Sequence, residues 1–173
     1  MEPRFITDPN EVALQAAVNA ADNQLLKARI KKIPVRVLDE RVAAIAGRVT
    51  QSIDCTTCAN CCKKLEPELS ITEIHQLRAH RQASLEAFTA RFLDYDTRRE
   101  VHYLKPVCTF LHDNKCTVYT DRPNACREYP RLVPDLKFRW KKTMEDYMIC
   151  PIVFNTIELL KAALSQLEDV PNR

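Results

Sequence analysis

The chain has 173 residues, of which 46% are hydrophobic; this is enough to bury one sizeable core, so we expect a single domain and no extensive disorder. Its 26 basic and 23 acidic residues leave a net charge of +3, which by itself does not indicate a nucleic-acid partner. The one glycine, Gly47, excludes a P-loop and a dinucleotide-binding fingerprint, because both motifs need several glycines.

The N-terminus has no recognisable export signal. Residues 1–8 are polar and acidic where a signal peptide needs an apolar stretch, and no run in the sequence reaches membrane-spanning length. We therefore expect a cytoplasmic protein without a membrane segment. In that compartment thiols stay reduced, so cysteines indicate metal or redox chemistry before disulfides.

Two helical patterns precede the first cysteine. Asp8 is a predicted N-cap, and the alanine-rich sequence after it predicts one helix that continues toward Arg29 and stops before Pro34. A second pattern covers residues 38–49, with its apolar side chains on one stripe. We assign residues 1–54 to an N-terminal helical extension, which packs on the rest of the chain, on a protein partner or on another copy.

Four cysteines then occur within eight residues: Cys55, Cys58, Cys61 and Cys62. The two-residue gaps let Cys55, Cys58 and Cys61 surround one centre, as in zinc ribbons and ferredoxin-type runs. Neighbouring side chains diverge by about 100° on a helix, so Cys61 and Cys62 do not easily bind one ion together. Cys62 is therefore the predicted spare thiol of the group.

The middle of the chain predicts shorter elements. Ser70 and Ser84 are placed as N-caps of two helices, and Ser70 forms a capping box with Glu73. Residues 101–103 and 108–119 favour extended structure, with a turn at 112–115 between two short strands.

The sequence after the last turn contains a basic stretch and a final helix. Residues 136–142 alternate basic with apolar side chains, which favours an amphipathic edge strand whose lysines discourage aggregation. A nucleic-acid surface is the alternative interpretation, but we do not expect nucleic acid as a partner. Pro151 suits the first turn of a C-terminal helix, which we assign to residues 152–173 and expect to pack on the metal-binding part.

Four further cysteines lie in the second half of the chain: Cys108, Cys116, Cys126 and Cys150. A total of eight thiols fits two four-thiolate zinc sites, or one [4Fe–4S] cluster with spare thiols. The three-cysteine run with two-residue gaps favours the [4Fe–4S] cluster, completed by one remote thiolate. Zn²⁺ is the alternative, in which a two-cysteine hook pairs with two remote thiolates.

Basic residues flank these cysteines. Four thiolates around Zn²⁺ or around a cubane leave a net charge near −2, which is costly to bury, so nearby cations should offset it. Arg122 and Arg127 are predicted to do so by hydrogen bonding and charge balance, and Lys63 and Lys64 are weaker candidates.

These motifs together resemble a known family. The phrases are Cys-x-x-Cys-x-x-Cys-Cys, Cys108-Thr-Phe-Leu, Cys116-Thr-Val-Tyr, Arg122-Pro-Asn-Ala-Cys126-Arg-Glu-Tyr-Pro, and a final Cys150. The chain thereby resembles the CxxCxxCC cysteine-cluster family, described as zinc- or iron-chelating, over residues 55–151. The resemblance implies that all eight cysteines are candidate ligands. Family members often have glycine before the vicinal pair, where this chain has Ala59 and Asn60.

Together these features predict a mainly α protein with a small β element, folded as a helical single domain around a cysteine-ligated metal site. We expect a metal-binding module and not a complete enzyme. A zinc-binding structural or metal-buffering protein is one alternative. A cluster-assisted lysine methyltransferase component is another, because the module also resembles part of the flagellin lysine N-methylases, although this chain lacks a glycine-rich loop for S-adenosylmethionine.

Overall fold

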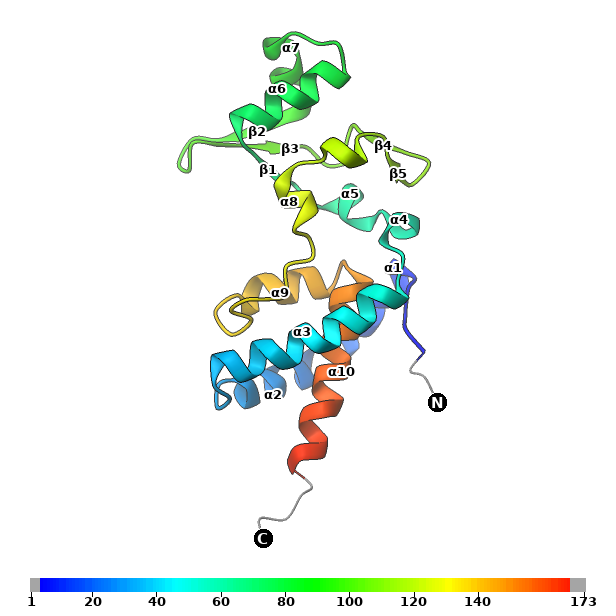
Figure 1. Cartoon of the computed structure of the whole chain (residues 1–173), viewed down its shortest axis with the longest axis vertical. Coiled ribbons are helices and arrows are strands. Elements are labelled where there is room, and N and C mark those ends of the chain that lie inside the picture. Colours follow the sequence, from blue (N-terminus) through cyan, green and yellow to red (C-terminus); the bar gives the residue numbers. More distant parts are fainter. Residues whose placement is uncertain (1–3, 169–173) are drawn as a thin grey trace. The chain divides into compact units, whose positions relative to one another are not determined.

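The computed structural model of the chain describes residues 4–168 (Figure 1). As predicted, the fold is mainly helical with a small antiparallel β element. The chain packs into two compact units: unit 1 contains residues 1–58 and 130–173, and unit 2 contains residues 59–129. The division into an extension, a metal-binding module and a final helix stays a prediction, and residues 169–173 of that helix lie outside the described residues.

Unit 1 is built from helices. They are α1 (Pro9–Val18), α2 (Ala20–Ile30), α3 (Val35–Ser52), α4 (Cys55–Cys58), α9 (Trp140–Tyr147) and α10 (Pro151–Glu168). Its core lies where α3 packs against α10. The stripe predicted on α3 and the inward face of α10 are both buried: Leu38, Val42, Ile45, Val49, Val153, Ile157, Leu160 and Leu164.

The start of α1 is capped as the sequence predicted. Asp8 Oδ1 accepts hydrogen bonds from the N–H groups of Asn10 (2.8 Å) and Glu11 (2.9 Å). The prediction of one helix as far as Arg29 was wrong, because the helix breaks at Asn19, whose ψ is 9°. The Asn19 side chain donates to the Tyr147 hydroxyl (3.4 Å), and asparagine is a residue that readily leaves helical geometry.

The segment 136–142 is not a strand, so the expected amphipathic edge strand was wrong. Residues 136–139 form a turn, in which the N–H groups of Phe138 and Arg139 both donate to the Asp135 carbonyl (3.0 Å each), and α9 begins at Trp140. The buried residues are Leu136 and Trp140, four positions apart. This helical spacing outweighs the alternation of basic and apolar residues.

Unit 2 mixes short helices and strands. In chain order these are α5 (Asn60–Lys64), β1 (Glu68–Leu69), α6 (Ile71–His80), α7 (Leu85–Phe92), β2 (Leu93–Asp96), β3 (Val101–Leu104), β4 (Leu111–His112), β5 (Lys115–Cys116), η1 (Tyr119–Asp121) and α8 (Asn124–Arg127). The antiparallel sheet has the order β1-β3-β2, and β4 and β5 form a separate hairpin.

Both predicted caps of unit 2 are present. Ser70 Oγ accepts from the Glu73 N–H, and Glu73 Oε2 accepts from the Ser70 N–H (2.8 Å), which completes the capping box. Ser84 Oγ accepts from the Ala87 N–H (3.1 Å). The small core of the unit is one cluster of buried apolar side chains: Leu69, Ile74, Leu77, Phe88, Leu93, Leu104, Phe110 and Val118.

None of the helices that the structure describes is, taken singly, long and apolar enough to cross a bilayer. Only α9 and α10 taken together meet these requirements, across a bend of 115°.

Candidate metal centre

The two units divide the eight cysteines between them. Unit 2 contains five: Cys61, Cys62, Cys108, Cys116 and Cys126. Unit 1 contains Cys55, Cys58 and Cys150. The geometry within unit 2 therefore defines the part of the candidate centre that can be described in detail.

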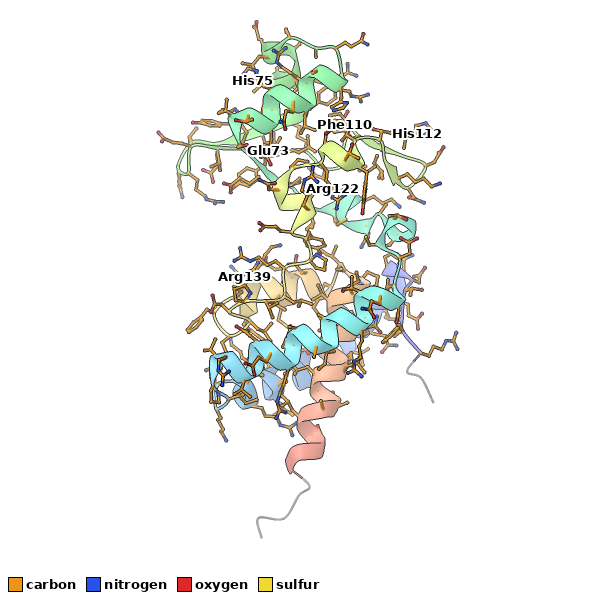
Figure 2. The ribbon with its side chains drawn as sticks, in the orientation of Figure 1. Glu73, His75, Phe110, His112, Arg122 and Arg139 are labelled. Carbon is orange, nitrogen blue, oxygen red and sulfur yellow. The ribbon has the colours of Figure 1, made fainter. Side chains whose placement is uncertain are left out.

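The β4–β5 hairpin brings Cys108 and Cys116 together. The Leu111 N–H donates to the Cys108 carbonyl (3.0 Å), and Leu111 lies opposite Cys116 in the antiparallel register. The hairpin closes through Asp113 and Asn114, whose φ values of 47° and 60° suit a two-residue hairpin turn. Both thiols are half-buried against the core cluster, and Figure 2 labels Phe110 and His112 on this hairpin.

Cys62 lies on α5, which is joined to the hairpin. The Cys108 N–H donates to the Cys62 carbonyl (2.8 Å), so the backbones of the two cysteines are in direct contact. The chain enters α5 through Ala59, which is buried and has a left-handed φ of 52°. Glycine adopts this conformation at little cost, which explains physically why glycine suits the position before the vicinal pair.

Cys126 is carried by α8, and α6 fixes its position. Glu73 Oε1 accepts a hydrogen bond from the N–H of Asn124 (2.7 Å), the first residue of α8, while its other oxygen serves the capping box of α6. A second link joins His80 Nε2 to Asp121 Oδ2 (3.2 Å). The sequence indicates Glu73 only as a cap, because a local motif does not reveal that one carboxylate accepts hydrogen bonds from two helices.

Four thiols of unit 2 lie within electrostatic range of one another. Burial raises the pKa of Cys108 to about 11, and repulsion from Cys62 and Cys116 adds to the shift. Burial raises the pKa of Cys126 to about 12, with further repulsion from Cys108, Cys62 and Cys116. The pKa of Cys116 is also raised by burial and by Cys62. Cys62, Cys108, Cys116 and Cys126, here called the unit 2 thiol cluster, are thus one electrostatic group.

Cys62 differs from the other three thiols. A hydrogen bond from Cys61, whose Sγ lies 4.0 Å from Cys62 Sγ, lowers the pKa of Cys62 to about 7 against the opposing effect of burial, and Lys63 contributes further. The expectation that Cys62 is the spare thiol rested on the two-residue spacing, which Cys61 continues, and on the divergence of the adjacent side chain; it stays a prediction. In the structure, the charge of Cys62 contributes to the raised pKa of all three remote thiols of the unit.

Arg122 and Arg127 occupy different positions around the cluster. The Arg122 guanidinium lies 3.7 Å from the centre of the Tyr119 ring, and its charge lowers the pKa of Cys116 and Cys126 against burial. Arg127 Nε donates to the Arg122 carbonyl (2.9 Å), and another of its nitrogens donates to the Thr120 carbonyl. Arg122 is therefore placed for charge balance, whereas Arg127 braces the loop.

The cysteines of unit 1 lie near the ends of helices. Cys55 is exposed at the start of α4, where the Asp54 carboxylate accepts from the Thr56 N–H (2.9 Å) and hydroxyl (2.7 Å). Cys58 is half-buried at the end of the same turn. Cys150 is buried just before α10. These three and Cys61 stay predicted ligands.

The donor set of the cluster fits a soft metal. Four thiols without a competing carboxylate suit Zn²⁺ or an iron–sulfur cluster, and the nearby Arg122 offsets their charge on ionisation. Within residues 4–168, no three His, Cys, Asp or Glu side chains form a group ready to hold an ion.

Fold and thiols together define a cysteine-rich metal-binding module. The profile of the CxxCxxCC family, described as a "putative zinc- or iron-chelating domain", matches residues 54–151, and the chain belongs to this family. Membership supports metal binding through the cysteines and is compatible with either metal. No curated protein and no solved structure matches the chain.

Proposed function

We propose that the chain is a metal-binding module in which Cys62, Cys108, Cys116 and Cys126 hold a metal centre, and that this centre is a [4Fe–4S] cluster. The observation that carries the proposal is the placement of these four thiols in one compact unit: the β4–β5 hairpin joins Cys108 to Cys116, and the Cys108 N–H donates to the Cys62 carbonyl (2.8 Å). Cys126 on α8 is close enough for the charges of the other three to raise its pKa. Four thiolates complete the coordination of a cubane, with one thiolate on each iron.

The choice of iron–sulfur over zinc rests on the adjacent run. Cys55, Cys58 and Cys61 lie outside the four proposed ligands, but the run keeps the two-residue gaps typical of cysteine-rich iron–sulfur proteins and would supply the spare thiols. A module with sulfur donors alone and reduced thiols belongs in the cytoplasm, where thiols are kept reduced. The chain's own residues would hold the cluster, balance its charge through Arg122 and limit solvent access through the half-buried hairpin.

Zinc is the second candidate, and the hairpin favours it. Cys108 and Cys116 flank a tight antiparallel turn, and Cys126 lies on a short helix, so the cluster combines a hairpin hook with remote thiolates. Tetrahedral Zn²⁺ takes four thiolates at about 2.3 Å in structural sites. In this case the module is a zinc-stabilised structural or buffering protein.

Metal analysis of protein purified without oxygen tests the proposal. A [4Fe–4S] protein should be brown, absorb near about 400 nm and contain about four iron and four sulfide per chain. Cys116→Ser should remove the cluster, whereas Thr117→Ser, the matched change at the next residue, should retain it. A colourless protein with stoichiometric zinc would overturn the iron assignment, and metal retained in Cys116→Ser would overturn the ligand assignment.

A further inference from the structure

The loop before α9 holds an aromatic side chain in solvent. Phe138 is 79% exposed, although Leu136 and Trp140 on either side of it are buried. The Asp39 carboxylate accepts from the N–H groups of Asp135 (2.9 Å) and Leu136 (3.4 Å), and Arg139 Nη1 donates to the Arg131 carbonyl (2.6 Å). The loop is therefore pinned on both sides of the exposed ring. Figure 2 labels Arg139 in this loop.

The same end of unit 1 is strongly basic. Residues 27–41 and 131–142 contain eleven Lys or Arg and three Asp or Glu, although the whole chain is nearly balanced at 26 to 23. Lys137 Nζ donates to the Lys31 carbonyl (3.1 Å), which joins the end of α2 to the loop. Figure 1 shows the α2–α3 turn and this loop at the same end of the unit. Of the three acids, Asp39 holds the loop, Glu40 pairs with Arg36 (2.8 Å), and Asp135 is exposed in the loop itself. Among the cations, Lys142 pairs with Asp146 (2.8 Å).

We propose that this basic end of unit 1 binds single-stranded nucleic acid, with Phe138 stacking on a base and the surrounding lysines and arginines contacting phosphates. An aromatic face stacks on any base, and cations beside it displace the counterions of the backbone. The expectation of no nucleic-acid partner rested on the small net charge of the whole chain and on an edge strand, and the structure replaces that strand with this pinned loop. The inference is independent of the metal centre.

The surface fits a nucleic acid better than a membrane. Insertion into a bilayer uses several apolar side chains from one face. In residues 27–41 and 131–142, all of which the structure describes, Phe138 is the one large hydrophobic side chain that is strongly exposed. A single ring among cations is a stacking platform.

Fluorescence anisotropy with the full chain tests this inference, using a labelled single-stranded RNA of about 12 nucleotides at about 50 mM salt. Phe138→Ala should weaken binding at least about fivefold, as loss of one stacked base does. Phe138→Leu, which keeps an apolar side chain but no ring, should weaken it similarly. Tyr95→Ala, which removes an exposed aromatic of unit 2 (52% exposed), is the matched control and should bind like the wild type.

A charge variant gives a second readout. Lys32→Glu should weaken binding and flatten the dependence of log K on log salt, whereas Arg98→Glu in unit 2 should leave both unchanged. Circular dichroism of each variant confirms that it is folded. Absence of binding, or wild-type affinity in Phe138→Ala, would overturn the proposal. Binding to vesicles rich in phosphatidylserine but not to RNA would overturn it in favour of a membrane surface.

Discussion

Unit 1 and unit 2 differ in the length of their helices and strands and in the size of their apolar cores. Unit 1 packs two 18-residue helices, α3 and α10, along a continuous apolar core. In unit 2 the strands β1, β4 and β5 have two residues each, and one small cluster forms the core. Small folds with little buried apolar area commonly depend on metals or other cross-links. From this comparison we expect unit 2 to depend more strongly on a bound metal for its stability than unit 1 does.

The largest expected effect is that of removing a ligand from unit 2. Cys126→Ser should lower metal content and destabilise unit 2 by several kcal/mol, on the order of 3 or more, because metal-binding free energy is also folding free energy. Metal analysis and thermal unfolding check this together. Thr120→Ser, at an exposed residue of the same loop, is the control and should change neither.

A core substitution in unit 1 should lower the unfolding free energy without changing the metal content. Leu160 on α10 is fully buried, so Leu160→Ala should cost about 2–5 kcal/mol of unfolding free energy through the cavity it leaves. Leu25→Ala, at a residue 61% exposed, should cost under about 0.5 kcal/mol. Denaturant unfolding measures both. Metal content should stay unchanged in both variants; loss of metal in Leu160→Ala would mean that the units are not energetically separate.

Metal binding to unit 2 should depend on pH, because thiols lose protons when they bind a metal. Cys108 and Cys126, with pKa values of about 11 and 12, and Cys116, whose pKa is also raised, are protonated at pH 8, whereas Cys62 with a pKa of about 7 is mostly ionised. Metal binding at pH 8 should therefore release about three protons per centre, and the metal affinity should fall as pH falls. A pH indicator in weakly buffered solution counts them.

The stability of metal-free unit 2 should change with pH in the opposite direction to metal affinity: it should fall as pH rises. A raised folded pKa stabilises the fold below the ordinary thiol pKa of about 8.5, and this contribution is lost as pH rises toward the folded values. The unfolding free energy of chelator-treated protein should thus decline above about pH 9. A flat profile would contradict the burial of these thiols.

The smallest of these effects concerns Glu73. Glu73→Ala removes the acceptor of both the α6 and the α8 N–H groups and should cost about 1–3 kcal/mol in unit 2, with weaker metal retention. Glu73→Gln keeps one acceptor and should cost less. Glu86→Ala, in the exposed first turn of α7, is the matched control. Thermal unfolding at constant metal load distinguishes them, and equal effects of Glu73→Ala and Glu86→Ala would refute the two-helix role.

Local signals in the sequence predicted the elements well. Asp8, Ser70 and Ser84 marked helix starts because their side chains cap the first backbone N–H groups, which is a property of adjacent residues. The break at Asn19 was missed because no proline or glycine marks it in the alanine-rich sequence around it. The loop at 136–139 was missed because Asp39 holds it from another helix.

The candidate site was predictable as a set of residues but not as an arrangement. The family resemblance identified all eight cysteines as candidate ligands, and the turn between Cys108 and Cys116 followed from Asp113 and Asn114. The contact of Cys62 with the hairpin did not follow, because it is a backbone hydrogen bond to Cys108. Charge balance by Arg122 and bracing by Arg127 likewise depend on the loop that Glu73 and His80 hold in place.

Hydrogen–deuterium exchange on metal-loaded and metal-free protein tests most directly the claim that unit 2 depends on its metal. Metal removal should lower the protection of the amides of α5, the β4–β5 hairpin and α8 well below that in the loaded protein, while α3 and α10 keep theirs. Equal protection of unit 2 with and without metal, or loss of protection in both units together, would contradict it.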